Sequence, residues 1–185
     1  TKKSTEAGED AMQNQLITQA SGEAAEADRR FGGCSQAVLG ALQHTLGIGD
    51  DQSFKAGTIL SGGIARRGET CGALIGALMA LGVECGRRVM PDTDHYNLAM
   101  DHAQDVVDLF KSTLAQRFRF AAPLESTLCS EIQTRLFGRS FRLADPVERK
   151  AFIDSGGHAP EGCPLVCAIA AEAAAKKILE LRQSR

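Results

Sequence analysis

Four of the six cysteines in this chain stand where the sequence predicts the start of a helix: Cys34, Cys71, Cys129 and Cys163. Each has glycine or proline within a few residues, and these residues commonly mark helix boundaries. A helix start offers unpaired backbone N–H groups and the positive end of the helix dipole, and both stabilise a thiolate. The thiolate binds metals and attacks disulfides. We therefore expect lowered thiol pKa values and sulfur chemistry that converges in one site.

The elements that must position these cysteines are helices. Apolar residues recur at three- and four-residue spacing almost throughout, and β-branched residues are too dispersed to predict strands. Leu16, Ala20, Ala24, Ala27 and Phe31 form one such stripe. Helices are expected over residues 16–31, 33–46, 51–61, 71–81, 94–118, 125–137 and 164–181, with another turn or two from residue 146. The sequence therefore predicts an all-α, single-domain helical bundle of about six to eight helices, in which residues 1–10 form a flexible tail and residues 11–185 the domain.

The segment from Cys71 to Gly76 carries two glycines inside a predicted helix. A glycine in a helix interior costs about 1 kcal/mol relative to alanine, so its presence needs a reason. Gly72 leaves room beside the sulfur, and Gly76 lies one turn below Cys71 on the same face. We expect both glycines to admit another backbone or a bulky cofactor.

The cysteines of the last predicted helix and Cys85 differ in how well they could contribute to a shared site. Cys163 and Cys167 lie one turn apart on the apolar stripe of the last predicted helix, so either could reach a shared site. Cys163 is the better thiolate because it lies at the helix start. Cys85 follows a predicted helix end, where the dipole disfavours an anion, and is expected to have no role. His158 lies in a glycine-containing loop near Cys163 and could touch the site.

Composition excludes several classes of function. The chain has 185 residues, 43% hydrophobic and 24% charged, with 21 basic and 23 acidic residues and a formal net charge of −2. This balance gives no electrostatic basis for binding nucleic acid or an anionic membrane. No apolar run approaches the roughly 20 residues that span a bilayer. The absence of a dense, loop-rich cysteine framework favours a reducing cytoplasm, although a removed export signal stays open.

Two other patterns do not lead to a site. Residues 63–70 have the glycine spacing of a phosphate-binding loop, but Glu69 stands where that loop needs lysine and no strand precedes it. The histidines show no metal-binding pair with a carboxylate base, and no serine–histidine–acid arrangement can be assigned. We therefore name no catalytic residue and no enzyme class.

Three stretches of the chain resemble the redox-active proteins named for a C–GCAxxG–C–C pattern, which carry four family cysteines and a CGAxxG motif. These stretches are the helix start at residues 34–38, the turn at residues 61–64 and the block at residues 71–76. The resemblance runs from about Phe31 to Leu181. It places the family cysteines on Cys34, Cys71, Cys129 and Cys163, and Cys167 is an alternative for the fourth. A related domain occurs in split-Soret cytochromes, but this chain has no C-x-x-C-H sequence for covalent haem.

The resemblance and the cysteine pattern together leave three hypotheses open. The first is an electron-transfer protein whose four family cysteines ligate a [2Fe–2S] or [4Fe–4S] cluster, with Gly72 and Gly76 beside it. The second is a thiol–disulfide exchange protein that uses the same cysteines without metal. The third is a structural helical protein with buried thiols. The first implies a redox partner protein or a small electron acceptor, and the alanine-rich helices would permit a homo-oligomer.

Overall fold

The computed structural model describes residues 2–184 and contains eight α-helices and one short 3₁₀ helix. In chain order they are α1 (Lys2–Phe31), α2 (Cys34–Leu46), α3 (Asp51–Ala56), η1 (Gly57–Leu60), α4 (Gly72–Cys85), α5 (Thr93–Arg117), α6 (Cys129–Phe137), α7 (Pro146–Asp154) and α8 (Cys163–Gln183). Within residues 2–184 the only β-type pairing is an isolated bridge between Thr70 and Leu128. The predicted all-α bundle in a single domain is confirmed.

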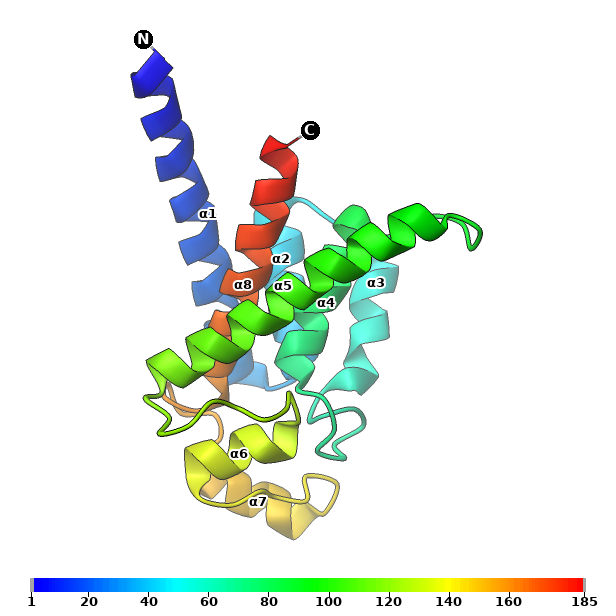
Figure 1. The fold of residues 1–185 in the computed structure, drawn as a ribbon. Coiled ribbons are helices and arrows are strands. Elements are labelled where there is room, and N and C mark those ends of the chain that lie inside the picture. Colours follow the sequence, from blue (N-terminus) through cyan, green and yellow to red (C-terminus); the bar gives the residue numbers. More distant parts are fainter. Residues whose placement is uncertain (1, 185) are drawn as a thin grey trace.

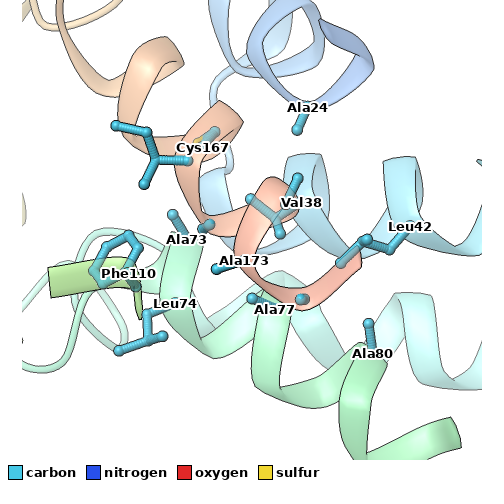
Figure 2. Packing of buried hydrophobic residues seen from close by; sticks show 14 of the residues in the cluster. Ala24, Val38, Leu42, Ala73, Leu74, Ala77, Ala80, Phe110, Cys167 and Ala173 are labelled. Carbon is cyan, nitrogen blue, oxygen red and sulfur yellow. The ribbon is translucent and has the colours of Figure 1, made fainter. Parts of the chain in front are cut away.

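Helix α8 lies at the centre of the fold and packs against α1, α2, α4 and α5. Its sequence is rich in alanine, which has the highest helix propensity and lets neighbouring backbones approach closely. Residues 166–171 of α8 are all buried, and so are Ala173, Ala174 and Ala175. Figure 2 shows Ala173 and Cys167 of α8 within the same core cluster as Val38 of α2 and Ala73 of α4. The core is therefore built from small side chains around one central helix.

Local sequence signals explain most helix boundaries. Gly47 ends α2 in the left-handed conformation, and its N–H donates to the carbonyl of Gln43. Asp50 begins α3 with a capping box that it forms with Ser53. Asp92 caps α5, and Asp145 caps α7 just before Pro146. Among the helices of residues 2–184, none is both long enough and apolar enough to cross a membrane.

Several expected boundaries were wrong. Helix α1 begins at Lys2 and not near residue 16, and it is longer than α5, which was expected to be the longest helix. No proline interrupts residues 2–31, so nothing in this segment prevents the backbone hydrogen bonds of a continuous helix. Phe31, expected on the buried stripe, is 78% exposed. Helix α4 continues through Gly82 to Cys85, because one exposed glycine is tolerated in a helix interior.

The crossing of α2 and α4 depends on Gly76. A Cβ atom on Gly76 would clash with the backbone of Ser35 in α2, including its Cα atom at 3.2 Å. Gly76→Ala should therefore destabilise the protein by about 1–3 kcal/mol, as overpacking does. Gly82→Ala on the same helix is the matched control, because nothing lies within 4 Å of its Cβ position. It should stabilise the protein by about 0.5–1 kcal/mol.

Urea unfolding followed by circular dichroism measures both changes in the free energy of unfolding. Equal effects of the two substitutions would contradict the close helix crossing.

Candidate functional site

The four predicted cysteines lie at helix starts, as the sequence indicated. Cys34, Cys129 and Cys163 are the first residues of α2, α6 and α8, and Cys71 is the N-cap of α4. Helices α2, α4 and α8 begin at the same end of the bundle, the end that faces α6 and α7 (Figure 1). Four segments that are distant in the sequence therefore deliver their first turns to one region.

A short backbone pairing brings the starts of α4 and α6 together. The N–H of Cys71 donates to the carbonyl of Thr127 at 2.8 Å, and the N–H of Cys129 donates to the carbonyl of Glu69 at 2.7 Å. These bonds hold the residues before α6 extended, which is why α6 begins at Cys129 and not near residue 125 as predicted. No periodic pattern in the sequence predicted this pairing, because it spans only a few residues.

The two glycines of the 71–76 block have separate roles. A Cβ atom on Gly72 would lie 2.5 Å from Sγ of Cys34, so this glycine makes room for the sulfur of α2. The prediction had assigned that space to the sulfur of Cys71. Gly76 lies against the backbone of Ser35 and does not line the cavity described next. Of the two neighbours expected for Gly76, a backbone or a cofactor, the structure provides the backbone.

A cavity of about 620 Å³ opens among these helix starts, and five cysteines line it. They are Cys34, Cys71, Cys129, Cys163 and Cys167. Cys85, at the far end of α4, does not line it. None of the six cysteines, all of which lie in the described part of the chain, forms a disulfide with another. Within residues 2–184, no three His, Cys, Asp or Glu side chains are arranged to hold a single metal ion.

Cys167 is the deepest of the five thiols. It has no exposed surface, and its Sγ lies 4.0 Å from the carbonyl oxygen of Cys34. Cys163, one turn earlier on α8, is half-buried and packs against an aromatic cluster that includes Phe141 and Phe152. Both residues of the predicted α8 pair thus reach the same cavity.

The expectation of lowered thiol pKa values was wrong for the protein without a bound cation. Burial raises the pKa of Cys129 to about 12. Burial also raises the pKa of Cys34, although the N–H of Gly62 and the hydroxyl of Ser61 donate to its sulfur and oppose the rise. The free-energy cost of desolvating a thiolate in the cavity exceeds the stabilisation that these hydrogen bonds give to the thiolate.

The thiols also raise one another's pKa values. Burial is the largest cause for Cys71, and the neighbouring Cys129 and Cys34 add to it by charge repulsion. Burial again dominates for Cys163 and Cys167, and each is coupled to several other cysteines of the cavity. A cation bound among these sulfurs would reverse both effects, because it favours the thiolate.

Asp28 and His158 form a polar pair on the cavity wall. Asp28 of α1 is 1% exposed, and its carboxylate lies 3.1 Å from Nδ1 of His158. The hydrogen bond to Asp28 raises the pKa of His158. The sequence marked His158 as able to touch the site, and the structure places it there. Asp28 was missed, because an acidic residue near a helix end normally indicates only a solvated face.

Two further polar groups hold the cysteines in place. The buried amide of Gln133 donates to Sγ of Cys129 at 3.4 Å and accepts from the N–H of Phe141 at 2.8 Å. The buried hydroxyl of Ser35 shares a 2.7 Å hydrogen bond with Ser61, which itself contacts Cys34. Both side chains lie within four residues of a predicted cysteine on a helix, which is the only signal that sequence offers for them.

The turn that precedes α4 has an uncommon conformation. Residues 62–66 all have positive φ, with values of 67°, 68°, 56°, 51° and 62°. The first two are glycines, but Ile64, Ala65 and Arg66 each bear a Cβ, and this conformation costs such residues about 1–2 kcal/mol. Gly63 is tightly packed, because a Cβ there would lie 2.7 Å from Cβ of Cys129. This left-handed turn forms part of the cavity wall through Gly62, Ala65 and Arg66.

Comparison with known proteins gives one match. A family model described as "Putative redox-active protein (C_GCAxxG_C_C)" matches residues 33–180, which include all six cysteines. No curated protein and no solved structure matches the chain.

Proposed function

Because the chain belongs to the C_GCAxxG_C_C family of redox-active proteins, we propose that it carries an iron–sulfur cluster for electron transfer, with Cys34, Cys71, Cys129 and Cys163 as ligands. The observation that supports this proposal best is the convergence of thiols from four helix starts on one cavity. Four cysteine ligands meet the requirement of either a [2Fe–2S] or a [4Fe–4S] cluster.

The donor set suits such a cluster. Thiolates are the usual ligands of iron–sulfur centres, and a bound cluster supplies one-electron transfer. In the metal-free cavity the sulfurs repel one another when they ionise. Bound metal atoms would instead attract the thiolates. In a cluster, each metal atom binds only some of the cysteines. The sulfurs therefore need not lie as close together as they would around a single ion. This agrees with the lack, in residues 2–184, of a set of three side chains arranged for a single ion.

The protein's own groups would tune the site. N–H groups of Ala73 and Leu74 point at the sulfur of Cys71 from the first turn of α4. Gln133 donates to Cys129, and Gly62 donates to Cys34. Hydrogen bonds to ligand sulfurs raise the reduction potential of iron–sulfur centres, so these donors favour the reduced state. The electron would pass to a redox partner protein or a small acceptor.

A thiol–disulfide exchange protein is the second candidate. One observation favours it, namely that the cavity holds five thiols, one more than a cluster takes. The raised thiol pKa values weigh against it, because few of these sulfurs would be thiolates at neutral pH. A protein with merely buried thiols is less consistent with the family.

Purification without oxygen tests the proposal. We expect a brown protein with visible absorption, and with iron and acid-labile sulfide in equal amounts. A colourless preparation without iron would reject the cluster. Thiol titration then separates the alternatives: a loss of two or four thiols on mild oxidation would indicate exchange, and an unchanged number would indicate a structural role.

A further inference from the structure

The mouth of the cysteine cavity is apolar and exposed. Phe31 at the end of α1, Ile59 in η1 and Ile153 in α7 all line the cavity, and they are 78%, 71% and 52% exposed. Three large apolar side chains from separate elements are therefore held in water around one opening. Exposed apolar groups gathered in this way mark binding surfaces.

The left-handed turn adds a positive charge to this mouth. Arg66 lines the cavity at the end of the turn. A Cβ on Gly62 would lie 3.1 Å from Cγ of Arg66, so the arginine stem packs where Gly62 has no side chain. Among the residues that the structure describes, none forms an ion pair or hydrogen bond with its guanidinium. The strained backbone thus positions a cation that no residue in the described part of the chain pairs.

Apart from the thiols, the charged side chains that line the cavity favour an anion. Asp28 is the one carboxylate among the described lining residues, and it is engaged with His158. Arg66 and Arg149 are the arginines of the lining, and the guanidinium of Arg149 donates to the carbonyl of Leu143. The volume of about 620 Å³ lies within the range of small-molecule sites, roughly 300–1,000 Å³.

We propose that this cavity binds a small molecule with an apolar body and a carboxylate or similar anionic group, the apolar body against Phe31, Ile59 and Ile153 and the anion on Arg66. The proposal goes beyond the cluster and does not require it. A cluster would occupy the inner wall of thiols, whereas the ligand lies at the mouth. Recognition joins burial of apolar surface with a charge-assisted hydrogen bond.

A matched pair of probes tests the proposal. Naphthalene-2-carboxylate and naphthalene-2-carboxamide share one apolar body and differ in charge, and calorimetry on the anaerobically purified protein measures both affinities. We expect saturable binding of the carboxylate, with the carboxamide about three- to tenfold weaker. Arg66→Gln should weaken carboxylate binding by the same factor and remove the preference between the probes.

Arg67→Gln is the matched control, because Arg67 is an exposed neighbour on the same turn that does not line the cavity. It should leave both affinities unchanged. Ile153→Asp, an exposed position on α7, tests the site without touching the turn and should also weaken carboxylate binding. Absence of saturable binding, equal affinity for the two probes, or equal effects of the two arginine variants would overturn the proposal. Visible absorption reports the cluster separately, so the two proposals can fail independently.

Discussion

Cys71→Ser is expected to yield a colourless protein that retains no iron and no labile sulfide. Cys71 is buried at the N-cap of α4, and burial is the largest cause of its raised pKa. Charge repulsion from Cys129 and Cys34 raises that pKa further, so Cys71 lies close enough to interact with both sulfurs. A serine hydroxyl is a poor substitute for a thiolate as a ligand of iron. Anaerobic purification followed by absorption spectroscopy and iron analysis measures the loss.

The fold should survive this substitution, which makes the result decisive. Serine is among the preferred N-cap residues, and its hydroxyl can accept from the N–H groups of α4 that approach the sulfur of Cys71. The metal-free variant should therefore unfold at the same urea concentration as the metal-free wild type, or at a slightly higher one. Loss of colour could then not be attributed to unfolding.

Cys85→Ser provides the control on the same helix. Cys85 is the last residue of α4 and lies away from the cavity. This variant should keep the full absorption and iron content. A bleached Cys85 variant, or a Cys71 variant that stays brown, would show that the ligand set is wrong.

Alkali is expected to destabilise the reduced, metal-free protein progressively as the pH rises from 8 to 10. The five cavity thiols have folded pKa values above the ordinary value of 9.0, and that of Cys129 is about 12. Below about pH 9 the thiols are protonated in both states, so their contribution to stability is fully present. As pH rises further, the unfolded chain releases protons that the folded protein retains, and the contribution is lost.

Above its unfolded pKa, each thiol that stays protonated in the folded protein lowers the free energy of unfolding by at most about 1.4 kcal/mol per pH unit. Urea unfolding at a series of pH values, with a chelator and a phosphine reductant present, measures the slope. Cys129→Ala should make the slope shallower by about one thiol's share. A slope that is flat above pH 9, or unchanged in the variant, would contradict the burial of these thiols as neutral groups.

The sequence predicted the helices and the site cysteines because both depend on local signals. Apolar periodicity identified α2, α5 and α8, and glycine or proline near each cysteine identified the helix starts. Gly72 was recognised as a position of close approach. What it approaches, the sulfur of Cys34, could not be predicted, because the contact joins α2 to α4 and leaves no pattern in either segment.

The pKa values were predicted in the wrong direction for a related reason. Dipoles and N–H groups at a helix start can be inferred from a short segment, but burial depends on everything packed around it. Cys167 shows the difference, since it has no exposed surface only because α1, α2 and α4 cover α8. Asp28 likewise became part of the site through its contact with His158, 130 residues further along the chain.

The dispersal of the thiols over α2, α4, α6 and α8 has a consequence for biogenesis. Helix α8 follows α2, α4 and α6 in the chain and supplies the last cysteines of the cavity, so the full set of sulfurs exists only after α8 has left the ribosome. A nascent polypeptide that lacks α8 offers scattered cysteines but no enclosed site. Insertion of any prosthetic group must therefore follow the synthesis of α8, and its retention would report that these four helices have docked.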